Sequence, residues 1–397
     1  MARLNTGAVS VASVVVGSVL CWLVFPVAAV QSAGYQGPLD DAKSFHGSKI
    51  AFGGDRASQD EPDEIYVMNA DGTGERQVTV REQLTFPPGC NSLYPRWSPD
   101  GKQIAFTCAY PQRGIPVAEI WLTDGTTMTQ LTSMFKTTIG GIEYQGAVFP
   151  TWSPDGKQIA FVGLSVLNNI IMRQIFIINA DGTDLRGPLI TGNTPDWSAN
   201  GQWLLFARSQ TVYVIALDDL LNRSGNAIQL TNKDSTGNFE RHGFDGGPRW
   251  APDGRRIVFE RALINEPNRP YVAVMNPGEP EPTSTPEQIT TADELVIPHQ
   301  VFPSWSPDGR WILFQRLLCD PTKYGQMAPN GNDLFAVAVG ADPDGSHREV
   351  RLTSGACPGP PAPGEPFGTF VPQNSTFVPR STFSAWASWA PGRTVQH

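Results

Sequence analysis

The sequence predicts an all-β fold assembled from repeated small sheets. Three observations predict it: the composition, an internal repeat, and the division of one repeat between the two ends of the chain. Glycine and proline account for 39 and 35 of 397 residues, and only 17% of residues are charged. This composition is typical of short strands joined by tight turns. The formal net charge of -9 argues against nucleic acid or an anionic membrane surface as a partner.

The N-terminal segment, residues 1–33, has the pattern of a secretory signal peptide. Arg3 precedes an uncharged apolar run over 8–25, which Pro26 and several small residues then close. The alternative is an uncleaved anchor, because the run is long enough to cross a bilayer once. We favour cleavage, and we expect the remainder to be periplasmic or extracellular, without a further membrane span.

A motif of the form Pro-x-Trp-Ser-Pro-Asp-Gly, followed by an apolar strand that ends in Phe, recurs along the chain. Its copies begin at Pro95, Pro150, Pro195, Pro248 and Pro303. Each copy predicts a β-hairpin, because proline presets the first angle of the turn and glycine accepts a positive φ. The recurring Asp100, Asp155, Asp253 and Asp308 are interpreted as turn formers, since an aspartate bonds to the backbone two residues on.

Each hairpin is followed by a third strand, a second turn and a short fourth strand. We expect the fourth strands to end at Leu84-Thr85, Leu131-Thr132, Ile190-Thr191, Leu230-Thr231, Ile289-Thr290 and Leu352-Thr353. Four antiparallel strands of this kind form one blade of a β-propeller.

The two ends of the chain predict the number of blades. Residues 49–52 begin a blade that lacks its first strand, and residues 387–389 supply such a strand close to the C-terminus. The sequence therefore predicts a six-bladed β-propeller over residues 45–397. The C-terminal strand completes blade 1 and closes the ring, which leaves no open sheet edge.

The Trp-Ser-Pro-Asp-Gly-Lys and Asn-Ala-Asp-Gly-Thr signatures resemble the WD40-like (PD40) repeats of TolB-like six-bladed propellers. The resemblance covers about residues 45 to 397 and implies docking of a partner in the periplasmic Tol system. Similar propellers also occur in peptidases, lyases and extracellular binding proteins.

The cysteines predict two disulfides. Removal of the signal would leave Cys90, Cys108, Cys319 and Cys357, for which three connectivities exist. The hairpin topology favours pairing Cys90 with Cys108 and Cys319 with Cys357. The alternative is a thiol metal site, but neither pair has the close spacing of a zinc knuckle.

The connections opposite the Pro-Asp-Gly turns vary widely in length, which indicates a face available for binding. Candidate ligand-binding residues at this channel mouth are Arg241, His242, Asp245, His299 and Gln300. We therefore expect a monomeric binding module for a protein or an envelope component, with no cofactor. The alternative is a metal-assisted carbohydrate lyase or hydrolase, in which His242 and His299 would hold a divalent metal in the channel.

Overall fold

The computed structural model describes thirteen segments of the chain, which together contain almost only β-strands. These segments are 49–54, 62–79, 86–112, 115–168, 170–231, 242–263, 269–276, 279–282, 286–290, 300–317, 332–340, 347–353 and 385–389. Some residues within them, including 242–244, 269–276, 279–282 and 300–301, are described in their backbone only. Among these segments the single α-helix is α1 (Leu217–Leu221). No helix in the described segments is long and apolar enough to cross a membrane.

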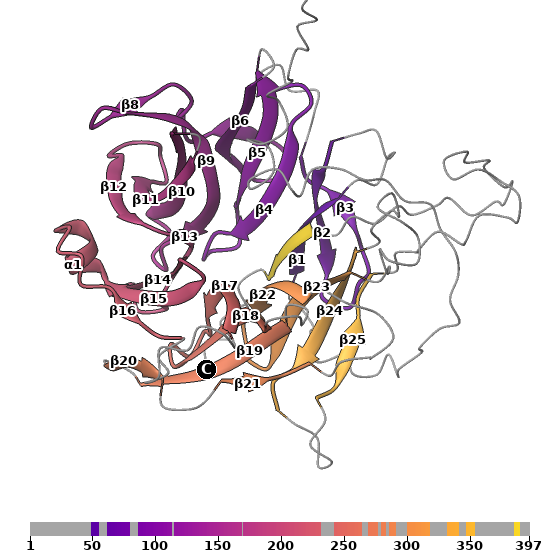
Figure 1. Cartoon of the computed structure of the whole chain (residues 1–397). Helices are drawn as coiled ribbons and strands as arrows, with labels where there is room; N and C mark the ends of the chain where they lie inside the picture. Colours follow the sequence, from indigo (N-terminus) through magenta and orange to yellow (C-terminus); the bar gives the residue numbers. More distant parts are fainter. Residues whose placement is uncertain are drawn as a thin grey trace, which may run out of the picture.

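The strands form antiparallel meanders in chain order (Figure 1). One sheet joins the two ends of the described chain, in the order β26 (Ala385–Trp389), β1 (Lys49–Gly54), β2 (Glu64–Asn69) and β3 (Arg76–Gln77). In this sheet Ile50 pairs with Trp389. The C-terminal strand therefore does lie beside β1, as the divided repeat predicts.

Two successive meanders share one nine-stranded sheet. The first contains β4 (Asn91–Trp97), β5 (Ile104–Gln112), β6 (Ile115–Thr123) and β7 (Met128–Gln130). The second contains β8 (Thr138–Ile139), β9 (Ile142–Trp152), β10 (Gln158–Leu167), β11 (Ile170–Asn179) and β12 (Arg186–Thr191). They are joined by one parallel bridge between β6 and β9, at Ala118 and Gly146.

Three further sheets follow along the chain. The first comprises β13 (Asn193–Trp197), β14 (Trp203–Arg208), β15 (Thr211–Ala216) and β16 (Ile228–Gln229). The second comprises β17 (His242–Trp250), β18 (Arg256–Leu263), β19 (Arg269–Asn276) and β20 (Glu279–Pro282), with β21 (Glu287–Gln288) also paired to β19. The third comprises β22 (Gln300–Trp305), β23 (Trp311–Leu317), β24 (Asn332–Ala338) and β25 (Glu349–Arg351).

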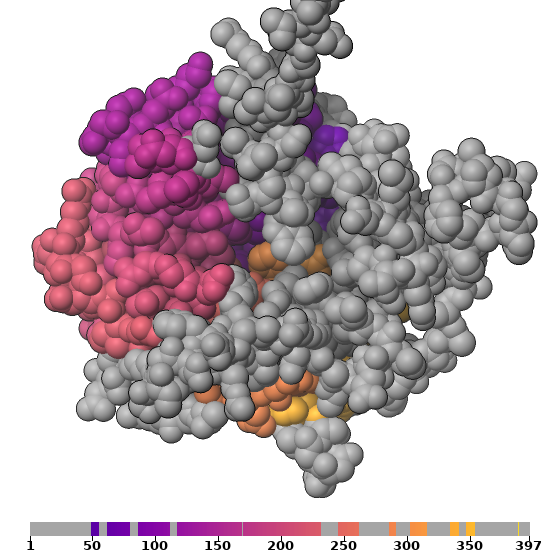
Figure 2. Space-filling view, viewed as in Figure 1, coloured from indigo at the N-terminus to yellow at the C-terminus, as the bar shows by residue number. Residues whose placement is uncertain are grey.

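The first strands of the meanders lie next to one another around a common centre (Figure 1). Strand β4 contacts β26 and β9, β13 contacts β9 and β17, and β22 contacts β17 and β26. In the space-filling view the residues from β8 to β16, coloured from bright purple to pink, form one continuous surface (Figure 2). The first strands therefore line the middle of the molecule, and the later strands of each meander lie farther out.

The hairpin turns form as the motif predicts. In the first copy the Asp100 carboxylate accepts bonds from the Ser98 hydroxyl (2.6 Å) and the Lys102 backbone N–H (3.1 Å), and Gly101 has a φ of 68°. Asp155, Asp253 and Asp308 likewise accept from the backbone N–H two residues on. These aspartates are turn residues, and their bonding accounts for their recurrence.

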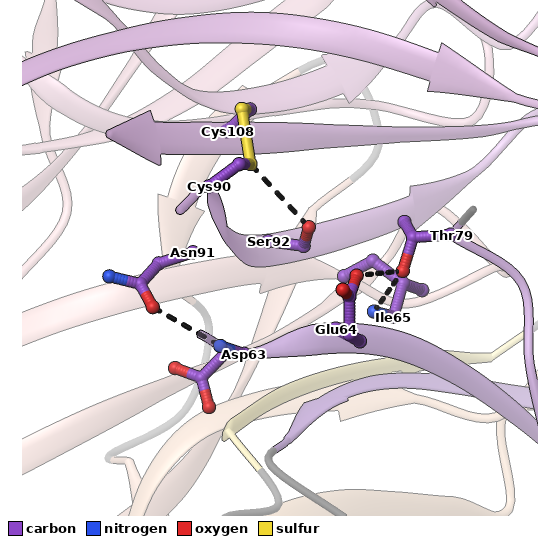
Figure 3. The surroundings of a disulfide bond; sticks show 8 residues. All are labelled: Asp63, Glu64, Ile65, Thr79, Cys90, Asn91, Ser92 and Cys108. Carbon is purple, nitrogen blue, oxygen red and sulfur yellow. Dashed lines mark hydrogen bonds between the residues drawn. A yellow bond between two sulfur atoms is a disulfide. The ribbon is translucent and has the colours of Figure 1, made fainter. Parts of the chain in front are cut away.

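The fourth strand of the first meander differs from the prediction. It is β3 (Arg76–Gln77), followed by Val78-Thr79, so the expectation that it ends at Leu84-Thr85 was wrong. The Thr79 hydroxyl accepts a bond from the Ile65 N–H at 3.1 Å and donates to Glu64 (Figure 3). Thr132 makes the same pair of bonds, with Ile120 and Glu119. This anchoring of threonine identifies the Thr79 segment as the true equivalent.

Apolar packing between neighbouring sheets forms the core. The second strands continue beyond the phenylalanine of the motif, and these phenylalanines are at most 1% exposed: Phe52, Phe106, Phe161, Phe206, Phe259 and Phe314. Trp311 of β23 packs against Ile50 and Phe52 of β1, and Trp203 packs with residues of β14 and β18. These contacts join one sheet to the next, so burial of the repeated apolar positions also sets the order of the sheets.

Candidate functional site

The first strands carry an unusual backbone feature at the same point of the repeat. The residue before each repeat proline has a left-handed φ: 56° at Tyr94, 58° at Phe149, 46° at Thr194, 53° at Gly247 and 57° at Phe302. Each lies at a β-bulge, where the pairing register with the second strand shifts. Side chains other than glycine rarely adopt this conformation, and bulky ones least often.

Three of these left-handed residues are aromatic, and their rings meet although they belong to different sheets or meanders. The Tyr94 ring centroid lies 4.1 Å from that of Phe149 and 6.1 Å from that of Phe302. All three side chains are half-buried. We call Tyr94, Phe149 and Phe302 the aromatic layer. Its members come from β4, β9 and β22, which places the layer in the space that the first strands surround.

The residue after each repeat proline is polar, and three of these residues are charged: Arg96, Asp196 and Arg249. We call these three the charged layer. The Asp196 carboxylate accepts the Trp250 backbone N–H at 2.8 Å and the Thr151 hydroxyl at 3.3 Å. The Nη1 of Arg249 donates to the Pro248 carbonyl at 2.8 Å and, at longer distance, to the Thr194 carbonyl at 3.4 Å. The charged layer thus ties β9, β13 and β17 together.

Burial dominates the electrostatics of the charged layer. It raises the pKa of Asp196, against the opposing effect of Arg249 and the Trp250 N–H. Burial also lowers the pKa of Arg96 to about 9, and repulsion from Arg249 adds to that shift. The pKa of Arg249 is lowered by burial, while Asp196 and Glu260 oppose the shift. These effects show that charges from opposite sides of the centre act on one another.

A second ionic cluster involves a residue that comes before the left-handed position of β17, and its partners on β18. Asp245 is fully buried, and its two carboxylate oxygens accept bonds from Arg261 at 2.7 and 2.8 Å. Glu260 is 5% exposed and interacts electrostatically with Tyr94. Burial raises the pKa of the Tyr94 hydroxyl, although the nearby Arg173 favours its ionised form. The aromatic layer is therefore bounded by charged side chains on both sides.

Of the predicted channel-mouth residues, the structure describes one side chain. Asp245 lies in β17, buried against Arg261. His242 and Gln300 begin β17 and β22, and their side chains lie outside the description, while Arg241 and His299 lie outside the described residues altogether. The described part of the chain contains no group of three or more His, Cys, Asp or Glu residues that could hold a metal ion.

The Cys90–Cys108 disulfide links the segment before β4 to β5 (Figure 3). The two Cα atoms are 5.4 Å apart, and both side chains are buried. Nearby, the Asn91 side chain accepts the Asp63 N–H at 3.1 Å, which ties β4 to the segment before β2. The predicted pairing of these two cysteines is present, whereas Cys319 and Cys357 lie outside the described residues.

The aromatic and charged layers were not among the residues singled out from the sequence. The sequence does contain a sign of them. The residues on either side of the repeat proline differ from copy to copy, whereas the tryptophan recurs in every copy. Comparing these positions across the copies would have found Tyr94, Phe149 and Phe302. Their left-handed backbone and their convergence depend on the sheet arrangement, which a single repeat does not reveal.

Comparison with known proteins adds information on the fold. The chain matches no protein-family model and no curated protein by sequence. Among solved structures it is similar to TolB from Acinetobacter baumannii, with a TM-score of 0.54 and 16% identity over 87% of this chain and 67% of that one. A putative TolB from Agrobacterium tumefaciens gives a TM-score of 0.49 and 20% identity over 78% of this chain and 90% of that one. An oligogalacturonate lyase from Vibrio parahaemolyticus gives 0.45 and 13% identity, over 81% and 78%.

The protein therefore has a TolB-like β-propeller fold. That conclusion is carried by the meanders around a common centre and by the similarity to the Acinetobacter baumannii TolB. At such sequence identity the similarity concerns the fold alone, and the function has to be argued from the site.

Proposed function

We propose that the chain is an exported six-bladed propeller that docks a protein or an envelope component at its central channel and on its variable loop face. Six blades are supported by the succession of first-strand contacts from β26 through β4, β9, β13, β17 and β22 back to β26. Counted in this way, the nine-stranded sheet contributes two blades joined at one bridge. Export is supported by the signal-peptide pattern of residues 1–33.

The observation that carries the binding function is the aromatic layer. Gly247 occupies the equivalent bulge position in β17 with a similar φ, so the fold itself is satisfied by glycine there. A left-handed non-glycine residue costs about 1–2 kcal/mol. Placing Tyr94, Phe149 and Phe302 at such positions is therefore unfavourable for folding, and strain of this kind is characteristic of functional sites.

The aromatic layer suits a binding role because of its exposure and chemistry. Its three residues are half-buried, so each keeps some exposed surface. Aromatic rings contribute large contact areas at low cost in conformational entropy, which is why they are enriched at the centres of binding interfaces. The charged side chains on both sides would add hydrogen bonds and direction.

The test is capture from an envelope extract with the immobilised chain. The double variant Phe149→Gly/Phe302→Gly removes two rings, and glycine adopts the left-handed backbone conformation at both positions without strain. The control Lys102→Ala/Lys157→Ala changes exposed lysines in the Pro-Asp-Gly turns. We expect one component to be retained by the unmodified chain and by the control but lost from the glycine variant. That component would then be purified and its Kd measured against all three chains.

Two results would contradict the proposal. One is that the unmodified chain retains nothing beyond blocked resin. The other is that the purified component binds the glycine variant as tightly as the unmodified chain. Circular dichroism of the glycine variant checks that the fold is intact.

A further inference from the structure

The charged layer joins side chains from opposite sides of the centre. The Asp196 carboxylate accepts bonds from Thr151 of β9 and Trp250 of β17, and Arg249 of β17 donates to Thr194 of β13, so these two side chains join three neighbouring first strands. In the succession of first strands, β4 and β17 are three steps apart. Burial lowers the pKa of Arg96 of β4, repulsion from Arg249 adds to that shift, and attraction to Asp196 opposes it.

Among the described charged side chains that interact with one another around the first strands, arginines are prominent. They are four arginines and three carboxylates: Arg96, Arg173, Arg249, Arg261, Asp196, Asp245 and Glu260.

Several polar atoms of the first strands are buried without a hydrogen-bond partner among the described residues. They are Arg249 Nε, Thr194 Oγ1 and Ser388 Oγ, on side chains that are 8%, 6% and 4% exposed. Ser388 occupies in β26 the position that Arg96 occupies in β4, since Trp389 pairs with Ile50 as Trp97 pairs with Ile104. The unpartnered atoms belong to the charged layer and its neighbours, and a bound group could satisfy them.

We propose that the charged layer binds a carboxylate group of the ligand, while an apolar part of the ligand packs against the aromatic layer. Guanidinium groups match the geometry of carboxylates and can donate two parallel bonds. Arg96 is half-buried, and its side chain makes its one hydrogen bond within the described residues to the adjacent Pro95 carbonyl, at 3.2 Å. Arg96 therefore keeps donors for a carboxylate.

The spacing of the two layers supports a ligand that carries both groups. Tyr94 and Arg96 are two residues apart on β4, and Phe302 and Ser304 are related in the same way on β22. An aromatic carboxylate could place its ring in one layer and its charge in the other. This assignment rests on the proposed binding function and specifies the chemistry of the ligand.

Small probes test the assignment on the full exported chain. Benzoate carries a ring and a carboxylate, acetate carries the carboxylate alone, and benzyl alcohol carries the ring alone. Isothermal titration and Tm shifts at constant ionic strength should show that benzoate binds about tenfold more tightly than either of the other probes. No benzoate binding, or equal affinity for benzoate and acetate, would overturn the proposal.

Variants locate the two parts of the site. Arg96→Gln should weaken benzoate binding about tenfold or more and leave folding intact, because it removes both the repulsion from Arg249 and the attraction to Asp196. The control Arg310→Gln changes an exposed arginine in a turn and should leave the affinity unchanged. Phe149→Gly should weaken benzoate binding but not acetate binding. Unchanged benzoate affinity in Arg96→Gln would overturn the proposal.

The outcomes distinguish this inference from the proposed function. If the capture experiment succeeds and benzoate does not bind, the chain is a binding module but its ligand does not use the charged layer. If benzoate binds and no envelope component is captured, the carboxylate site stands and docking of a macromolecule fails.

Discussion

The indole N–H of Trp305 donates a hydrogen bond to the backbone carbonyl of Arg249 at a distance of 3.2 Å. The same bond joins Trp152 to the carbonyl of Arg96, at 3.1 Å. In both pairs the repeated tryptophan of one meander bonds to the residue that follows the repeat proline in the preceding meander. Trp152 and Trp305 thus have two roles: their rings are buried, and their N–H groups hold the strands that carry the two arginines of the charged layer.

Replacing Trp305 with Phe should therefore cost more than a similar change at a tryptophan without this bond. Trp197 is buried to nearly the same extent, 7% against 6% exposed, and its indole nitrogen has no partner within the described residues. Both substitutions lose ring volume, but only Trp305→Phe also removes a hydrogen bond, the one to the Arg249 carbonyl. We expect Trp305→Phe to lose about 0.5–1.5 kcal/mol more than Trp197→Phe, measured by urea unfolding. Equal losses would contradict this role.

A second prediction concerns the parallel backbone bridge between β6 and β9, at Ala118 and Gly146. A Cβ added at Gly146 would collide with the Ala118 carbonyl oxygen and lie 2.8 Å from its nitrogen, whereas a Cβ at Gly140 meets no described atom within 4 Å. Both glycines have a positive φ. Gly140→Ala should cost about 1–2 kcal/mol from backbone strain alone. Gly146→Ala should cost clearly more, because two strands must separate. Similar urea midpoints for the two variants would show that the bridge can relax.

Much of the fold could be predicted because the repeat encodes it locally. A proline, an aspartate and a glycine in succession specify the hairpin turn through their own backbone preferences, and Asp100 bonds as expected. The C-terminal strand could be placed beside β1 because the first repeat lacks its own first strand in the sequence. The fourth strand of that meander could not, since β3 has two residues and its defining feature is the non-local bond between Thr79 and Ile65.

The candidate site was harder to predict because its residues meet only when the sheets pack together. Two copies of the repeat lie between Arg96 and Arg249 in the sequence, and neither arginine is unusual in its own hairpin. The sequence drew attention to His242 and His299, since histidine chemistry can be recognised from residue type alone. It did not reveal Tyr94, because the significance of that residue lies in a left-handed φ of 56° and in contacts with rings from two other strands.

Asp124 provides a pH-dependent prediction. Its carboxylate accepts the Thr127 N–H at 2.7 Å and the Thr126 N–H at 2.8 Å, and these bonds, with the threonine hydroxyls, hold its pKa well below the usual 3.8. Because the folded-state pKa is lowered, the stabilisation is complete above the unfolded-state value and is lost as the pH falls through the lower folded-state value.

Asp124→Asn should accordingly lower the urea midpoint at pH 7, and the difference from the unmodified chain should shrink below about pH 4. Asp218→Asn, in the exposed first turn of α1, serves as the control for a simple change of surface charge. A difference that stays constant between pH 7 and pH 3 would show that the turn does not depend on the ionised carboxylate.

The last prediction concerns the cysteines: the stability that the Cys90–Cys108 disulfide contributes, and the pairing of the two cysteines that lie outside the described residues. Cys90 and Cys108 are 18 residues apart, and a crosslink closing a loop of that length stabilises a folded chain by about 3 kcal/mol. Cys90→Ala/Cys108→Ala should lose about that amount in urea unfolding, and a reductant should shift the unmodified chain in the same direction. If Cys319 and Cys357 are paired as the sequence predicts, the variant beginning at residue 34 should show no free thiol when denatured without reductant. Two free thiols in the chain beginning at residue 34 would disprove that pairing. If Cys90→Ala/Cys108→Ala is as stable as the unmodified chain, the Cys90–Cys108 crosslink contributes little to folding.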